Sequence, residues 1–206
     1  MTGGGASALE EAVKRARRLL RERPGPVVLA LDGRSGAGKS TFAAALARRL
    51  DACLIEGDDF YAGGVGILSD PPPVRAARCI DWQAQRLVLA ALRRGQAASY
   101  HAFDWDRFDG GTQTEPTRVG PARIVILEGV YAARPELADL VDLRILLQTP
   151  DATRLARIRA REGGIGPWEQ QWLDAEDWYF AQVAPDSGFD LVLRPADDGP
   201  RAAAAD

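Results

Sequence analysis

A glycine-rich segment, residues 33–40, carries the residue types that hold the phosphates of a nucleotide. Its sequence, Gly-Arg-Ser-Gly-Ala-Gly-Lys-Ser, matches the pattern G-x-x-x-x-G-K-[ST]. In that pattern backbone N–H groups surround the phosphates, the lysine reaches the outer ones and the serine hydroxyl binds Mg²⁺. Lys39 and Lys14 are the two lysines among 26 basic residues, so an ammonium stands here where the chain otherwise uses arginine. We therefore expect an ATP-binding loop made by Gly33, Ser35, Gly36, Ala37, Gly38, Lys39, Ser40 and Thr41.

Acidic residues follow two other apolar stretches, where phosphoryl transfer would need them. Transfer requires a held Mg²⁺, positive charge over the moving group and a residue that orients or deprotonates the nucleophile. Glu128 ends one stretch and is predicted to stand near the metal with Ser40; the alternative is a carboxylate facing water. Asp58 and Asp59 follow the other stretch, and two adjacent carboxylates repel each other unless a metal or a proton intervenes. We expect Asp58 to be the base for the acceptor hydroxyl and Asp59 to be secondary; alternatively both cap the next helical turn.

Three arginines are spaced to share one face of a helix. Arg154, Arg157 and Arg161 lie three and four residues apart, and a glycine-rich break at 163–167 follows them, as in the hinge of a closing lid. Arginines brought over the γ-phosphate would neutralise charge in the transition state. A solvated helix face is the alternative, and Arg159 points elsewhere. The predicted catalytic groups are Lys39, Asp58, Arg157 and Arg161, with Arg154 binding ATP.

Aromatic residues concentrate in residues 100–108. They alternate with acidic and basic residues, which suits a flat or sugar-like acceptor that stacks on a ring and is fixed by hydrogen bonds. Core packing is the alternative here, and it is the preferred interpretation for the tryptophan-bearing helix at 168–183. Glu176 and Asp177 on that helix could reach the acceptor or the lid, but we do not predict them to be catalytic. The predicted acceptor site consists of Asp58, Tyr61, Tyr100, Phe103, Asp104, Trp105 and Arg107.

Strands and helices are predicted to alternate along the chain. The strand cores are almost continuously apolar, which indicates a parallel sheet covered by helices on both faces. Ligands in such folds bind beyond the carboxyl ends of the strands, where the phosphate loop and the acids fall. Residues 62–80 are rich in Gly and Pro and are predicted to form a mobile loop. Strands are expected at 27–31, 52–56, 124–128, 143–147 and 190–193, and helices at 7–22, 41–50, 81–94, 151–161 with Asp151 as N-cap, and 168–183.

Composition limits the classes of protein. The 206 residues suffice for one α/β domain, and a net charge of −3 argues against a nucleic-acid-binding surface. Cys53 and Cys79 have neither metal-ligand spacing nor a paired framework, which suits a reducing cytoplasm. No signal peptide and no stretch of roughly 20 apolar residues is evident, so we expect a cytoplasmic protein without membrane contact. A monomer and a homodimer both remain open.

The motifs together resemble one enzyme family. Residues 33–41, 57–61, 124–129 and 154–161 are similar, in order over about residues 26–194, to the uridine kinase and phosphoribulokinase-like branch of P-loop kinases. The resemblance implies a three-layer P-loop NTPase fold: an α/β protein with a mostly parallel five-stranded sheet, helices on both faces and a small lid. The expected organisation is an N-terminal helix in 1–24, a kinase domain in 25–194 with its lid at about 157–168, and a disordered tail in 195–206.

The resemblance also implies roles for individual residues. In the family, an Asp-x-Phe-Tyr segment supplies the base through its first aspartate, which matches Asp58, and a strand-end Glu-Gly matches Glu128 and Gly129. It thus implies that Ser40, Asp58 and Glu128 surround Mg²⁺. Family uridine kinases place a histidine shortly after a Tyr-Asp segment, whereas here His101 directly follows Tyr100. Asp81-Trp82 likewise stands where the family shows Asp-His. Both departures concern substrate binding, so the acceptor need not be the uridine of the family's uridine kinases.

These observations predict an ATP- and Mg²⁺-dependent kinase for a hydroxyl of a small, nucleoside-like molecule of the uridine or cytidine type. The chain contains no asparagine, so the Asn-Lys-x-Asp motif by which small GTPases read guanine cannot occur. One alternative is a kinase for another small acceptor, such as an antibiotic, a pantothenate-like compound or a sugar acid. A second alternative is a nucleotide-binding regulatory module without an acceptor.

Overall fold

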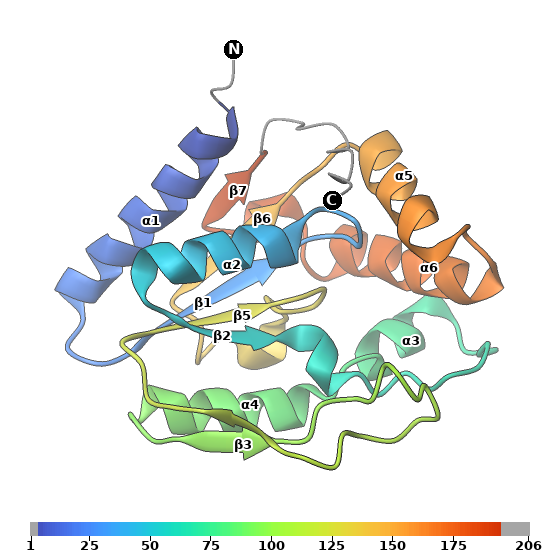
Figure 1. The fold of residues 1–206 in the computed structure, drawn as a ribbon. Coiled ribbons are helices and arrows are strands. Elements are labelled where there is room, and N and C mark those ends of the chain that lie inside the picture. The colour runs from blue at the N-terminus through green and yellow to red at the C-terminus, as the bar shows by residue number, and fades with distance from the viewer. Residues whose placement is uncertain (1–3, 195–206) are drawn as a thin grey trace, which may run out of the picture.

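A computed structural model of the chain describes residues 4–194 (Figure 1). Strands and helices alternate along most of it, as the apolar periodicity predicts. The helices are α1 (Gly4–Glu22), α2 (Lys39–Leu50), α3 (Pro72–Arg78), α4 (Trp82–Arg93), α5 (Asp151–Glu162) and α6 (Pro167–Gln182), with short 3-10 turns at Gly57–Phe60, Pro135–Leu137 and Asp186–Gly188. The strands are β1 (Val27–Asp32), β2 (Cys53–Glu56), β3 (Ala98–Tyr100), β4 (Thr117–Val119), β5 (Ile124–Glu128), β6 (Leu143–Leu147) and β7 (Leu191–Leu193).

Five strands form a parallel sheet in the order β2-β5-β1-β6-β7. In the register, Leu31 of β1 lies opposite Glu128 of β5, and Glu56 of β2 lies opposite Glu128 on its other side. The carboxyl ends of β1, β2 and β5 therefore meet at one edge of the sheet. The segments that follow these strands are the phosphate loop, Asp58 and Asp59, and the turn after Glu128, so the sheet gathers the predicted site residues at one place.

Helices cover both faces of the sheet, which gives three layers (Figure 1). Alternate residues of a strand point to opposite faces, and β1 shows this clearly. Leu29 and Leu31 belong to the core beneath α1 and α2, whereas Val28 and Ala30 belong to the core beneath α4 and α6. Both cores are apolar and fully enclosed along β1, so burial on two faces explains why the strand sequences lack polar alternation. The predicted α/β P-loop fold is confirmed.

Asp32 is a buried carboxylate at the end of β1. Its side chain is fully enclosed and accepts hydrogen bonds from the N–H groups of Gly33 at 2.8 Å, Tyr131 at 3.0 Å and Ala133 at 3.0 Å. The hydroxyl of Tyr179 on α6 donates a fourth bond at 3.1 Å. Burial raises the pKa of Asp32 to about 6, although these donors oppose the shift. Asp32 thus ties β1 to the turn after β5 and to α6.

Three local predictions differ from the structure. Residues 62–80, expected to be a loop, contain helix α3, which begins at consecutive prolines because proline is tolerated in the first turn. The antiparallel pair β3–β4 was not predicted, since three residues per strand give almost no periodic signal. Asp151 is the first helical residue of α5 rather than its N-cap; Pro150 holds the cap position, and the Asp151 carboxylate accepts a bond from Arg154 instead.

The description of the chain begins at residue 4 and ends at residue 194. The expected N-terminal helix is present as α1, and the predicted disordered tail at 195–206 lies outside the described residues. Among the helices of residues 4–194, none combines the length and the apolar character required to cross a bilayer.

Candidate active site

The phosphate loop connects β1 to α2 and depends on glycine at defined points. Gly36 and Gly38 have φ angles of 76° and 91°, in the left-handed region that side chains rarely adopt. A Cβ on Gly36 would also lie 2.4 Å from the carbonyl oxygen of Arg154 in α5. α2 begins at Lys39, so the free N–H groups of its first turn face the loop. Such a helix start with a wrapping loop is an anion site suited to phosphates.

A cavity of about 320 Å³ lies above this loop. Its volume is suited to the phosphate tail of a nucleotide, and its walls carry both cationic and acidic side chains. Lys39 within it donates to the carbonyl oxygen of Arg34 at 3.3 Å. Thus segments from β1, β2, β5 and α5, far apart in sequence, meet around one space. The predicted residues lining it are Ser35, Gly36, Gly38, Lys39, Ser40, Thr41, Asp58, Glu128, Arg157 and Arg161.

Ser40 and Glu128 form the part of the cavity that suits a divalent cation. The Ser40 hydroxyl donates to Oε1 of Glu128 at 3.1 Å. The second carboxylate oxygen of Glu128 is buried and has no hydrogen-bond partner within the described part of the chain. Burial raises the pKa of Glu128 to about 7, with Lys39 opposing the shift. An orphaned carboxylate oxygen beside a hydroxyl fits Mg²⁺.

No group of three or more His, Cys, Asp or Glu side chains among residues 4–194 is arranged to hold a metal by itself. Mg²⁺ rarely uses such a cage. It keeps several waters and takes one or two carboxylates together with substrate phosphates. The oxygen atoms of Ser40 and Glu128, beside a cavity that suits phosphates, match this coordination preference.

Asp58 and Asp59 face different surroundings. Asp58 is exposed and lines the phosphate cavity and also a second cavity beside it. Asp59 turns away and accepts a hydrogen bond from the hydroxyl of Tyr100 at 2.8 Å, while burial raises its pKa. The geometry separates the pair into one carboxylate open to two cavities and one held within the protein.

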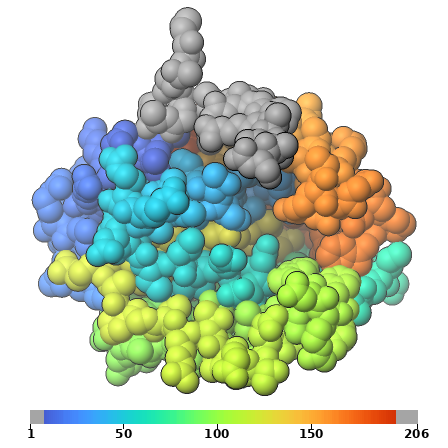
Figure 2. Space-filling model, in the orientation of Figure 1, coloured from blue at the N-terminus to red at the C-terminus, as the bar shows by residue number. Residues whose placement is uncertain are grey.

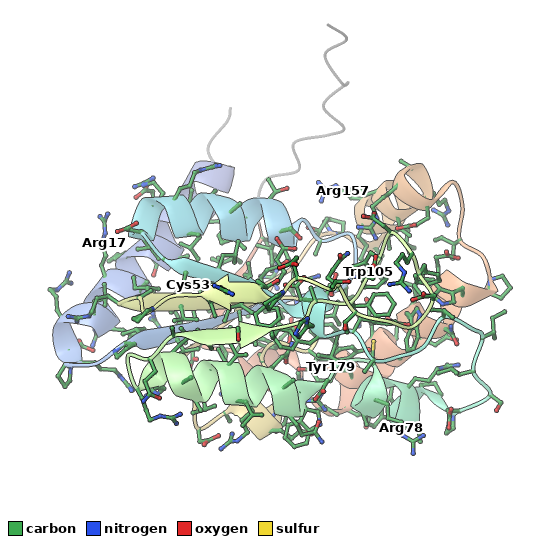
Figure 3. All side chains as sticks on the ribbon, turned by 60° about the horizontal axis from the view of Figure 1, so that its bottom comes forward. Arg17, Cys53, Arg78, Trp105, Arg157 and Tyr179 are labelled. Atoms are coloured by element: carbon green, nitrogen blue, oxygen red, sulfur yellow. The ribbon has the colours of Figure 1, made fainter. Side chains whose placement is uncertain are left out.

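The arginines of α5 occupy three different positions. Arg157 reaches over the phosphate loop and donates to the carbonyl oxygen of Gly36 at 3.2 Å. Arg161 lines both cavities and binds Glu162 at 2.6 Å. Arg154, predicted to bind ATP, is buried behind the loop, where its Nε donates to Asp151 at 2.6 Å. In Figure 3, Arg157 and Trp105 lie toward one end of the molecule and Arg17 toward the other.

The second cavity, of about 130 Å³, lies between α5, α6 and the segment after β2. It opens toward the phosphate cavity, because Ser35, Asp58 and Arg161 line both. Tyr61, predicted to bind the acceptor, lines this cavity. Trp168 and Trp172, expected only to pack the core, also form its wall, together with the buried Tyr131, Ile80, Leu173 and Glu176.

The remaining predicted acceptor residues build the loop beside this cavity. The ring of Phe103 packs 5.0 Å from Tyr61 and that of Trp105 packs 4.9 Å from it, so both support the wall from behind. The Trp105 side chain also donates to the Asp58 carbonyl oxygen at 3.3 Å. Tyr100 holds Asp59, and the buried Asp104 accepts the N–H of Arg107 at 3.0 Å. In Figure 2 this yellow-green segment and the orange helices α5 and α6 both lie on the surface of the face shown.

Glu176 and Asp177 connect α6 to the phosphate loop, a contact that the sequence analysis left open. The buried Glu176 carboxylate accepts the Ser35 N–H at 2.8 Å and the Ser35 hydroxyl. Asp177 forms an ion pair with Arg34. Burial raises the pKa of Glu176, with its bonds to Ser35 and the nearby Lys39 opposing the shift. The sequence signal that could have revealed this contact is the pair of neighbouring acids on a tryptophan-bearing helix.

A third cavity, of about 580 Å³, lies on the other side of the phosphate loop. It was not predicted from the sequence. Arg34 and Ala37 of the loop line it, with Thr149, Pro150 and Phe180. The Arg34 guanidinium lies 5.0 Å from the centre of the Phe180 ring. A stacked cation and aromatic ring beside a phosphate loop could hold a flat heterocycle.

The chain is similar to known kinases in sequence and in fold. No family model matches the chain. A uridine kinase from Leuconostoc citreum is 26% identical over 196 residues, covering 81% of this chain and 90% of the relative. Two solved structures share the fold. A protein described as a fructose transport system kinase from Silicibacter has a TM-score of 0.66 and 24% identity, covering 88% of this chain and 98% of its own. D-glycerate 3-kinase from Cryptococcus neoformans has a TM-score of 0.63 and 15% identity, covering 93% and 95%.

Proposed function

From the premise that this chain belongs to the uridine kinase and phosphoribulokinase-like branch of P-loop small-molecule kinases, we propose that it transfers the γ-phosphate of ATP to a hydroxyl of a small acceptor. The observation that carries the proposal is the position of Asp58, an exposed carboxylate that lines both the phosphate cavity and the cavity beside it. A hydroxyl held in the smaller cavity would therefore lie between a base and the phosphoryl group.

The donor nucleotide would occupy the phosphate loop and the large cavity next to it. Its β- and γ-phosphates would accept the N–H groups of the loop and the ammonium of Lys39. Its base would enter the 580 Å³ space beside Arg34 and Phe180. ATP is the donor that we propose, because the guanine-reading motif is missing from the sequence. Arg154 would act indirectly, since its buried side chain and backbone support the loop from behind.

Ser40 and Glu128 would hold Mg²⁺, which would neutralise the charge that develops on the phosphates. The chain's own groups perform the remaining work. Asp58 accepts the proton of the acceptor hydroxyl and orients its oxygen toward the γ-phosphorus. Lys39, Arg157 and Arg161 surround the transferring group with positive charge as it separates from its leaving oxygen.

A nucleoside of the uridine or cytidine type is the acceptor that the resemblance favours. Its sugar hydroxyl would lie at Asp58, and its base would extend past the 130 Å³ cavity toward the exposed Trp105 and the loop of residues 100–108. A second candidate is a smaller acceptor contained wholly in that cavity. The small volume favours it, because pockets for drug-sized ligands measure roughly 300–1,000 Å³.

An ADP-release screen tests the proposed function. Nucleosides, sugars, amino sugars, vitamins and aminoglycoside- or chloramphenicol-like compounds are added to the full chain with MgATP. We expect at least one class to raise ADP release above the rate with water alone. Asp58→Asn should lower that turnover by about 10²–10⁴ while leaving ATP affinity nearly unchanged. The matched variant Asp59→Asn should lose much less, because Asp59 bonds to Tyr100 away from both cavities. Slow hydrolysis that no compound accelerates would favour a nucleotide-binding regulatory module instead.

A further inference from the structure

The smaller cavity has an unusual balance of charge for a site next to phosphate. Its acidic and basic wall residues are four carboxylates, those of Asp58, Glu162, Glu169 and Glu176, and one guanidinium, that of Arg161. Arg161 is already paired with Glu162 at 2.6 Å. An acidic acceptor would find no uncommitted cation in this wall, and it would face carboxylates at short range.

Two carboxylates of the wall, Glu169 and Glu176, form no ion pair within residues 4–194. Glu169 accepts the N–H of Gly166 at 2.8 Å, a bond to a neutral donor that leaves the charge in place. Glu176 is 3% exposed and bonds to Ser35, again a neutral group, with Lys39 and Arg154 as nearby cations. When phosphates draw Lys39 toward themselves, Glu176 loses part of that compensation and keeps only the buried Arg154 nearby. A buried carboxylate without a full ion-pair partner is costly, so a cationic ligand would be favoured there.

The apolar part of the wall also suits a cation that carries hydroxyl groups. Tyr61, Tyr131, Trp168 and Trp172 supply aromatic rings, whose faces attract ammonium groups. The ring of Trp172 lies edge-on 5.8 Å from Tyr61 and 6.1 Å from Trp168, which forms an angular aromatic corner. The indole N–H groups of Trp168 and Trp172 and the hydroxyl of Tyr131 are buried without a hydrogen-bond partner among the described residues. Hydroxyl oxygens of a ligand could accept from such donors.

We infer that the acceptor is a compact amino alcohol or amino sugar, whose hydroxyl lies at Asp58 and whose protonated amine lies against Glu169, Glu176 and the aromatic corner. This inference rests on the proposed function. The cavity volume of about 130 Å³ equals that of roughly four molecules of liquid water, which limits the enclosed part of the ligand to a small polyol or a single sugar ring.

Binding of a series matched in size and differing in charge tests the inference without turnover. Saturation-transfer NMR titrations of the full chain with MgADP compare 2-aminopropane-1,3-diol, glycerol and glycerate, and then glucosamine, glucose and glucuronate. In at least one series the amine should bind about tenfold more tightly than the neutral member, as one desolvated cation–aromatic contact provides. The acid should bind more weakly than both. Equal affinities across each series, no measurable binding by either amine, or preference for the acid would overturn the inference.

Glu169→Gln sharpens the test, because glutamine at this helix position can still cap the Gly166 N–H while the charge is removed. The ratio of amine to neutral affinity should fall toward one, with the melting temperature of the protein unchanged. Asp174→Asn is the matched control: it removes the same charge from an exposed position of α6, where Asp174 accepts a bond from Gln170. It should preserve the ratio, and a ratio that survives in Glu169→Gln would refute the assignment of this residue. Failure of the proposed function is seen separately, as an absence of acceptor-dependent ADP release.

Discussion

Replacing Gly36 by alanine perturbs the contact between the phosphate loop and α5. An added Cβ would lie 2.4 Å from the carbonyl oxygen of Arg154 and 3.0 Å from its carbonyl carbon. Both atoms belong to the backbone of the first turn of α5, so rotating a side chain cannot relieve the overlap. The loop, the helix or both must move, and Arg157, which bonds to the Gly36 carbonyl, must move with them.

The cost has two parts. A non-glycine residue in the left-handed region costs roughly 1–2 kcal/mol, and Gly36 has φ of 76°. Forcing extra atoms into a packed contact costs roughly 1–3 kcal/mol. Together we expect Gly36→Ala to lower the free energy of unfolding by about 3 kcal/mol, which for a domain of this size lowers the melting temperature by roughly 6–12 °C.

Thermal unfolding with and without MgATP measures both consequences. The variant should melt earlier, and the rise in melting temperature that MgATP gives the native protein should largely disappear, because a ligand stabilises only a site that it can bind. Gly120→Ala is the control: its added Cβ meets nothing within 4 Å. If Gly36→Ala melts with Gly120→Ala and keeps the full response to MgATP, the proposed packing of α5 on the loop is wrong.

Three further outcomes follow from other contacts. Burial raises the pKa of Asp32 from 3.8 to about 6, so between these pH values the folded state keeps a proton that the unfolded state has released. The contribution of Asp32 to the free energy of unfolding therefore falls as pH rises through this interval. In denaturant titrations, the native protein should lose about 3 kcal/mol relative to Asp32→Asn between about pH 4 and pH 7. Arg157→Ala should lower kcat by roughly 10² or more, whereas Arg159→Ala, on another face of the same helix, should stay near native turnover; equal losses would remove Arg157 from charge stabilisation. Glu176→Ala should lower the free energy of unfolding by about 2–4 kcal/mol, because it empties a buried side-chain position and leaves the donors of the half-buried Ser35 unpaired, and a loss within 0.5 kcal/mol would contradict that bond pattern.

The parts of the site that sequence predicted are those written contiguously in the chain. The phosphate loop is specified by local backbone needs, above all glycine at Gly36 and Gly38, and these needs are visible in a run of eight residues. Glu128 was predictable because parallel strands deliver their last residues to one edge of the sheet. The sheet itself followed from apolar runs whose two buried faces leave no polar alternation.

The parts that sequence missed depend on where helices pack. α6 presents Trp172 to the 130 Å³ cavity and Glu176 to Ser35, and its sequence does not reveal these contacts because the buried face of the helix mixes polar side chains, Gln171 and Glu176, with apolar ones. Arg154 shares a helical face with Arg157, yet packing sends it behind the loop. Helical spacing predicts which residues are neighbours, but not what the shared face will contact.

Helix α6 contacts both the phosphate loop and the proposed acceptor cavity, and this shared contact has a thermodynamic consequence. Trp168 and Trp172 border the proposed acceptor cavity near the start of α6, and Glu176 accepts a hydrogen bond from Ser35 of the phosphate loop one turn further along. If ligand binding in one cavity shifts α6, the other cavity changes too, so donor and acceptor would alter each other's affinity. Thermodynamic linkage makes this effect reciprocal: the factor by which the nucleotide changes the affinity for the acceptor equals the factor by which the acceptor changes the affinity for the nucleotide.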